Sequence, residues 1–78
     1  MYENWDELEN GIQNCQKCKL CQRRQHIVLG EGNREAKLMF IGEGPGADED
    51  AQGLPFVGKA GKLMNKAFQG LGIDRSTV

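Results

Sequence analysis

An apolar run that stops abruptly at a cluster of glycines and a proline constrains this chain more than any other feature. The run covers residues 36–41, and residues 42–46 follow it with the sequence Gly-Glu-Gly-Pro-Gly. A buried strand that delivers an irregular loop to the edge of a sheet has this pattern, and ligand sites usually form at such edges. The pattern therefore predicts the architecture of a binding site.

The length and composition limit what can surround that loop. A chain of 78 residues forms one small domain, and such chains are marginally stable without a metal, a partner or more chain. A net charge of −1 favours no partner by long-range attraction. We find no apolar run of about 18 residues and no signal-peptide pattern, so we expect no membrane association and a cytoplasmic location.

The periodicity predicts a single partial domain in two parts. Residues 1–24 should form an N-terminal helix, capped by Asn4 and ending near residue 14, followed by a cysteine loop. Residues 25–78 should begin an α/β core. Two strands are expected over 26–29 and 36–41, and a core-facing helix over 60–71. Strand, loop, helix and an interrupted strand make the first half of a parallel α/β unit.

The three cysteines lie in one seven-residue window and predict metal ligands rather than disulfides. Cys15 and Cys18 are separated by two residues, a spacing that lets both thiolates face one metal, and Cys21 follows after two more. The spacing alone leaves an iron-sulfur cluster, zinc and no metal open. Because four ligands are the norm and only His26 could supplement the cysteines, we expect at least one ligand from outside this chain.

Two nucleotide-binding motifs nearly match the sequence. Residues 42–47 follow a strand as a dinucleotide fingerprint does, but Pro45 interrupts the turn and the acidic residues 48–50 would repel a pyrophosphate. Residues 53–59 match most of a P-loop, but Ala60 replaces the hydroxyl that holds magnesium. The sequence therefore disfavours phosphate binding at this loop.

Taken together, the motifs resemble, in order and spacing, the N-terminal part of the family 4 uracil-DNA glycosylases. The resemblance covers nearly the whole chain from Cys15 onward. It includes Cys15-x2-Cys18, Gly-Glu-Gly-Asn at 30–33, Gly-Glu-Gly-Pro-Gly at 42–46, Glu49-Asp50, and Gly-x-Pro-Phe-Val-Gly-Lys-Ala-Gly at 53–61 leading into Leu63.

The resemblance implies a fold, an activity and a cofactor. The fold is a three-layer α/β/α sandwich, of which this chain would hold one helix, the cysteine loop, two strands and a second helix. The activity is the removal of uracil from uracil-containing DNA in base excision repair. The cofactor is a 4Fe-4S cluster, with Cys15 and Cys18 among its ligands, and it is expected to be absent or incomplete in a fragment.

The resemblance also places the substrate. The target nucleotide would be flipped out of the DNA, and its uracil would stack on Phe56. The glycine-rich loop, with Gly42, Gly44, Pro45 and Gly46, would line the pocket and supply backbone contacts near the attacking water and the uracil carbonyl, because glycine permits close approach.

Two acidic residues are the candidates for roles that other residues play in better-known relatives. Glu43 is the candidate for positioning the water, because Gly44 stands where those relatives carry an Asp; bracing of the loop is the alternative. Glu49 is the candidate for excluding the thymine methyl group, because Gly46 stands where the relatives carry a Tyr.

Several residues that the family uses are not found among these 78. They are an Asn that reads the uracil edge, a His-Pro-Ser segment whose His stabilises the departing anion, and two further cluster cysteines; Cys21 is not one of the family's ligands. We therefore expect a fragment that is inactive by itself. The competing hypotheses are a small zinc- or iron-sulfur-binding module using Cys15, Cys18, Cys21 and His26, and a relative that binds another nucleobase or only binds DNA.

Overall fold

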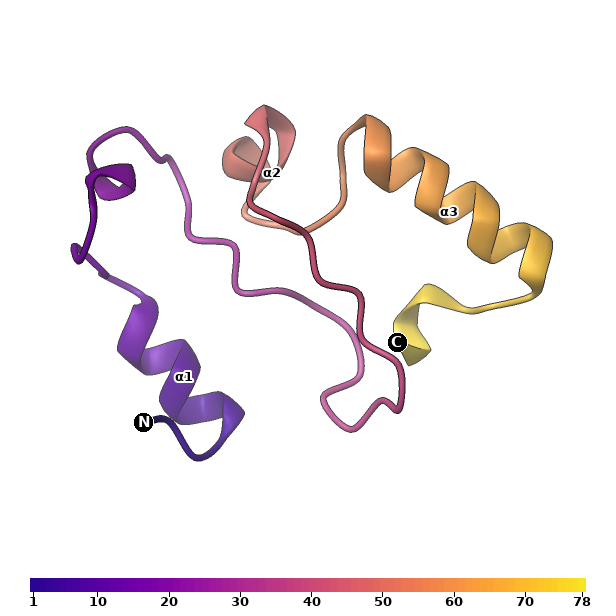
Figure 1. Cartoon of the computed structure of the whole chain (residues 1–78), viewed down its shortest axis with the longest axis horizontal. Coiled ribbons are helices and arrows are strands. Elements are labelled where there is room, and N and C mark those ends of the chain that lie inside the picture. Colours follow the sequence, from indigo (N-terminus) through magenta and orange to yellow (C-terminus); the bar gives the residue numbers. More distant parts are fainter.

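The computed structural model describes residues 1–78, and all its regular elements are helical (Figure 1). The molecule is flat and open, with extents of 39 × 29 × 16 Å. No helix has the length and apolar character needed to cross a membrane. The elements in chain order are α1 (Trp5–Ile12), η1 (Lys19–Gln22), α2 (Ala47–Gln52), α3 (Lys59–Leu71) and η2 (Arg75–Thr77), where η denotes a 3-10 helix.

Helix α1 begins where the sequence predicts. The Asn4 side chain accepts a hydrogen bond from the Glu7 amide at 2.9 Å, and the Glu7 carboxylate accepts one from the Glu3 amide at 2.9 Å. The bond from Glu7 satisfies a donor that a helix N-terminus leaves without a partner, and the bond from Glu3 holds the preceding residue to the first turn. The expected helix is thus confirmed, although it ends at Ile12 rather than near residue 14.

Arg34, in the turn at residues 34–35, connects this turn to α1. Its guanidinium pairs with Asp6 and with Glu9, each at 3.0 Å, and its carbonyl accepts a hydrogen bond from the indole of Trp5 at 3.2 Å. Hydrogen bonds with Asp6, which contributes most, and with Glu9 raise the pKa of Arg34.

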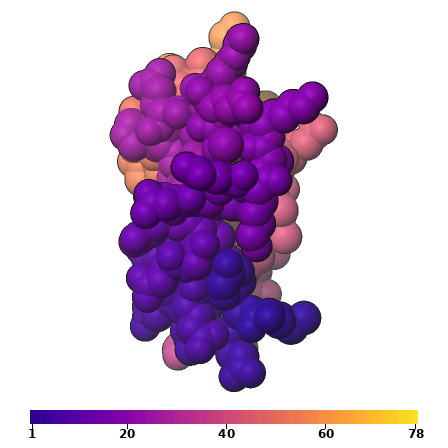
Figure 2. Space-filling view, turned by 90° about the vertical axis from the view of Figure 1, so that its left-hand side faces the viewer, coloured from indigo at the N-terminus to yellow at the C-terminus, as the bar shows by residue number.

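The side of the molecule drawn in Figure 2 consists mainly of α1 and the cysteine loop.

Helix α3 is the longest element and carries the one buried large side chain. Phe68 is 5% exposed and packs edge-on against Phe40, with ring centroids 5.0 Å apart. The helix ends at Gly72, which caps it with a φ of 70°. The expectation of a core-facing helix is confirmed at Phe68, whereas Leu63 and Leu71 remain exposed.

The two expected strands are not confirmed. Residues 26–29 and 36–41 have no regular secondary structure (Figure 1). A backbone hydrogen bond from Asn33 N to Val78 O, at 3.0 Å, connects the segment between them to the last residue. An apolar run identifies a segment suited to burial, but a strand also needs neighbours that bond to its backbone. Here residues 37–41 make no backbone–backbone hydrogen bond, and Leu38, Met39 and Ile41 are 49%, 61% and 82% exposed.

The acidic residues that follow the glycine-rich loop form a short helix. Helix α2 places Asp48, Glu49 and Asp50 in its first turn, where negative charge complements the helix dipole. Gly53 ends it with a φ of 72°. The glycine-rich loop therefore ends at Gly46, the N-cap of α2.

The packing of α3 against the preceding turn makes a testable prediction at Gly61. A Cβ atom there would lie 1.8 Å from the Phe56 carbonyl oxygen, whereas a Cβ at Gly70 in the same helix meets no atom within 4 Å. We expect Gly61→Ala to lower the free energy of unfolding by roughly 1–3 kcal/mol. We expect Gly70→Ala to raise it by roughly 0.5–1 kcal/mol.

Thermal unfolding of both variants, followed by circular dichroism, checks this prediction. Equal midpoints for the two variants would show that α3 does not pack against the Phe56 carbonyl.

Candidate functional site

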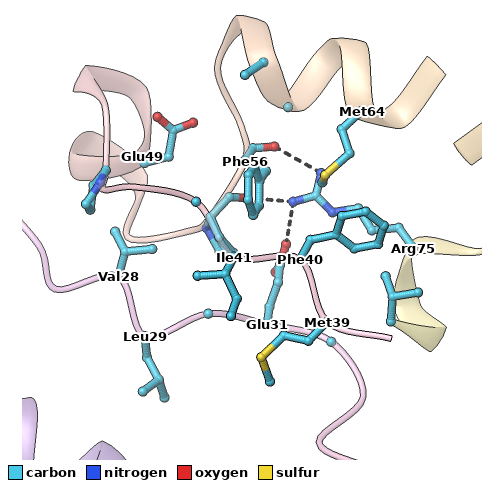
Figure 3. Close-up of a pocket in the computed structure, with 18 of the residues that line it drawn as sticks. Val28, Leu29, Glu31, Met39, Phe40, Ile41, Glu49, Phe56, Met64 and Arg75 are labelled. Carbon is cyan, nitrogen blue, oxygen red and sulfur yellow. Dashed lines mark hydrogen bonds and ion pairs between the residues drawn. The ribbon is translucent and has the colours of Figure 1, made fainter. Parts of the chain in front are cut away.

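A pocket of about 590 Å³ lies between the irregular residues 28–45, the turn at residues 55–58 and the start of α3 (Figure 3). A volume of this order suits a small-molecule site. Its lining combines apolar side chains with a few charged ones. Among the predicted site residues, those that line it are Gly42, Glu43, Gly44, Pro45, Glu49 and Phe56. Gly46 is not in the lining and serves instead as the N-cap of α2.

The Glu49 carboxylate is bound by three backbone N–H groups. One oxygen accepts from Val57 at 2.8 Å and from Gly58 at 2.6 Å, and the other accepts from Gly46 at 3.0 Å. These bonds, with Gly58 contributing most and Val57 next, lower the pKa of Glu49. Since Gly58 is the N-cap of α3, the carboxylate joins the first turn of α2 to the start of α3.

The Arg75 guanidinium binds the same turn from its carbonyl side. It donates to Pro55 O at 2.7 Å and to Phe56 O at 3.0 Å. It also donates to Asn65 at 2.8 Å and pairs with Glu31 at 3.3 Å. One half-buried side chain therefore connects η2, the 55–58 turn, α3 and the loop that contains Glu31. Figure 3 shows its bonds to the turn and to Glu31.

The peptide group between Phe56 and Val57 is held at both polar atoms. Its carbonyl accepts from Arg75, and its N–H donates to Glu49. Phe56 has a φ of 52° and is the one non-glycine residue with a positive φ. Such a conformation costs roughly 1–3 kcal/mol and persists only where the surroundings enforce it. The two charged side chains supply that enforcement.

The ring of Phe56 lies against the glycine-rich loop. A Cβ atom at Gly42 would be 3.2 Å from the tip of the ring, tighter than ordinary van der Waals contact. The two features that the sequence assigns to one site are thus brought together in the structure. A glycine at position 42 gives the ring room to approach the backbone.

The two acidic candidates differ in how their carboxylates are used. Glu43 lines the pocket, is exposed, and has no hydrogen-bond or ion-pair partner, whereas both oxygens of Glu49 are occupied by backbone donors. Glu43 is therefore free to accept a hydrogen bond from a ligand or a water. Of the two carboxylates, only that of Glu49 braces backbone in this structure.

The cysteines do not assemble a metal centre within the chain. Cys15 and Cys21 are half-buried and Cys18 is exposed, all three are free thiols, and no group of three or more His, Cys, Asp or Glu side chains has the geometry to hold a metal. Two thiolates at this spacing suit zinc or iron-sulfur chemistry, but the set of four ligands is not present among these residues.

Residues that sequence reasoning did not identify hold this arrangement together. Arg75 carried no signal in the sequence, because its partners lie at distant positions and it belongs to no motif. The Asp50 carboxylate accepts from the amides of Gln25 and His26 at 2.7 and 3.2 Å. The His26 Nδ1 donates to the Asp50 carbonyl at 2.6 Å, so that nitrogen is occupied and the ring is directed to α2.

The lowered pKa of Glu49 predicts how the turn responds to acid. A folded-state pKa below the unfolded value contributes stability that is present above the ordinary value of 4.5 and is lost as the pH falls through the folded value. We expect the amide signals of Val57 and Gly58 to move together, with a midpoint below pH 4.5. A pH titration followed by nuclear magnetic resonance (NMR) measures this.

Matched variants identify the responsible group. Glu49→Gln should abolish the titration of both amides, while Asp48→Asn, next to Glu49 in α2, should leave it in place. A titration that follows Asp48 instead would remove Glu49 from its assigned role.

Comparisons with known proteins agree on one family. The model of the uracil DNA glycosylase superfamily matches residues 29–78. A type-4 uracil-DNA glycosylase of Saccharolobus solfataricus is 48% identical over 77 residues, which cover 97% of this chain and 36% of that protein. The type-4 uracil-DNA glycosylase of Archaeoglobus fulgidus is 42% identical, and the match covers 97% of this chain and 38% of that protein. That of Thermotoga maritima is 43% identical, and the match covers 86% of this chain and 35% of that protein. The chain thus spans little more than a third of these relatives.

Proposed function

This chain belongs to the uracil DNA glycosylase superfamily, and we propose that it is the N-terminal part of a DNA-repair enzyme that hydrolyses the N-glycosidic bond of uracil in DNA. The observation that carries the proposal is the contact between the Phe56 ring and the glycine-rich loop inside a pocket of about 590 Å³. An aromatic ring beside exposed backbone offers a stacking surface together with polar groups that can read the edge of a base.

The substrate would enter as a flipped-out nucleotide. Its uracil stacks on Phe56, and the backbone of Gly42, Gly44 and Pro45 lies along the base and the scissile bond. Stacking of a base on an aromatic side chain is worth about 1–3 kcal/mol. Gly46 lies outside the pocket lining and acts indirectly, because as the N-cap of α2 it connects the loop to that helix.

Glu43 is the residue that we assign to the attacking water. Hydrolysis requires a water oxygen to bond to the sugar C1′ while the bond to uracil N1 breaks and uracil leaves with the electron pair. The free carboxylate of Glu43 can accept a hydrogen bond from that water and orient it. The absence of any bracing partner favours this role over support of the loop.

Glu49 would act on specificity through the shape of the pocket. Its carboxylate lines the pocket while holding the amides of Val57 and Gly58. A carboxylate fixed in this way can exclude the extra methyl group of thymine, because moving aside would break its bonds to the turn. We retain it as the candidate for discrimination between uracil and thymine.

In the complete domain, the exposed apolar segment would become a strand of a three-layer α/β/α sandwich. The exposures of Leu38, Met39 and Ile41 support this, since burying a large apolar side chain contributes about 1.5–3 kcal/mol. The superfamily match supports the α/β class in general.

The cysteine loop would contribute to an iron-sulfur centre. Cys15 and Cys18 are the proposed ligands, with the remaining ligands supplied from outside these residues, and Cys21 is not a ligand. The group would stabilise the loop. The alternative is a zinc module completed by His26, whose Nδ1 donates to the Asp50 carbonyl and whose Nε2 would be the nitrogen that binds the metal.

The ligand assignment predicts different outcomes for the three cysteines. In a longer protein that carries this chain, we expect Cys15→Ser or Cys18→Ser to remove iron and the broad visible absorption of a cluster. Cys21→Ser, the matched control, should retain both. Elemental analysis and absorption spectra decide, and stoichiometric zinc in a colourless protein would support the zinc module instead.

The direct test of the proposed function is release of the free base. The 78-residue chain alone should release no uracil at an enzymatic rate, because the resemblance assigns essential groups to residues outside it. The longer protein should release uracil from a single-stranded oligonucleotide and leave a thymine-containing oligonucleotide intact. Phe56→Ala should lower kcat/KM by about tenfold or more, given the worth of one stacked base. Failure of the longer protein to release uracil would refute the proposal.

A further inference from the structure

The Arg75 side chain has a role that goes beyond the proposed pocket residues. We infer that Arg75 is a positioning residue, which fixes the Phe56 ring in the orientation that a flipped base needs for stacking. The inference rests on the proposed function for the identity of the base, but the contacts that carry it are independent of that identity.

The Arg75 guanidinium binds the 55–58 turn at two backbone carbonyls. Its two terminal nitrogens donate to two consecutive carbonyls, those of Pro55 and Phe56, at 2.7 and 3.0 Å. A planar fork with several fixed donors can hold both carbonyls at once, whereas the single ammonium of a lysine acts as a point charge. The fork therefore fixes the orientation of the peptide groups on both sides of Phe56.

The backbone of Phe56 is strained. Its φ of 52° turns the chain so that the ring faces Gly42. A phenylalanine without external constraints would return to a negative φ, because Cβ crowds the backbone in the left-handed region. Arg75 opposes that relaxation on the carbonyl side of the residue, and Glu49 opposes it through the next amide.

The hydrogen bonds of Arg75 exclude a direct catalytic role for this residue. Nη1 donates to Phe56 O and to Asn65, and Nη2 donates to Pro55 O and to Glu31. These four bonds use all four hydrogens of the two terminal nitrogens. None remains on them for a base or a phosphate, although Arg75 lies in the pocket lining.

NMR on the 78-residue chain tests the clamp without reference to uracil. A positive φ gives Phe56 a strong intraresidue contact between its amide and Hα protons. We expect that signal in the unsubstituted chain, its loss in Arg75→Gln and its weakening in Arg75→Lys. Lys66→Gln removes a positive charge from an exposed site on α3 outside the pocket and should leave the signal unchanged.

A retained contact between the rings of Phe40 and Phe68, whose centroids are 5.0 Å apart, shows that each variant keeps its packing. If Arg75→Gln loses that contact, Arg75→Lys decides. A Phe56 signal that is missing from the unsubstituted chain, or that survives both Arg75 variants, would overturn the inference.

Kinetics of the longer protein test the consequence for the substrate. Arg75→Lys should raise KM for a uracil-containing oligonucleotide by about tenfold, the loss expected from one misplaced stacking partner, with a smaller change in kcat. A purely structural defect would lower the active fraction, and hence kcat, at unchanged KM. If the longer protein releases no uracil at all, the proposed function fails while the NMR result still decides the clamp.

Discussion

The peptide group between Phe56 and Val57 is the constraint on which the rest of the site depends. Its carbonyl is held by the positive charge of Arg75 and its N–H by the negative charge of Glu49. Hydrogen bonds to charged groups are stronger than those between neutral groups, and these two act from opposite sides of one rigid plane. They hold Phe56 in a backbone conformation that it would otherwise leave, and the direction of its ring follows.

Helices α2 and α3 provide groups that hold this peptide group in place. Helix α2 supplies Glu49 from its first turn, and α3 begins at Gly58, whose amide binds the same carboxylate. Gly61 lets α3 pack against the Phe56 carbonyl, where any side chain would collide. A pocket therefore forms in a chain with little buried core. The proposed stacking on Phe56 requires a ring that is already oriented, because ordering it on binding would cost conformational entropy.

The sequence predicted the parts that local pattern determines. The N-cap at Asn4, the extent of α3 and the pairing of Phe56 with the glycine-rich loop were accessible from spacing, capping chemistry and the family resemblance. The network around Arg75 was not, because its partners lie up to 44 positions away and carry no periodic signal. The strands over 26–29 and 36–41 were inferred from apolar character, which shows a tendency to be buried but does not supply a pairing partner.

The central claim is that the 55–58 turn is clamped, and amide hydrogen exchange on the 78-residue chain measures it most directly. The amides of Val57 and Gly58, both bound to Glu49, should exchange far more slowly than that of Gly44, which has no acceptor. Their protection should fall in Glu49→Gln and in Arg75→Gln alike, because each substitution releases one side of the same turn. Exchange of Val57 and Gly58 as fast as that of Gly44 would contradict the account.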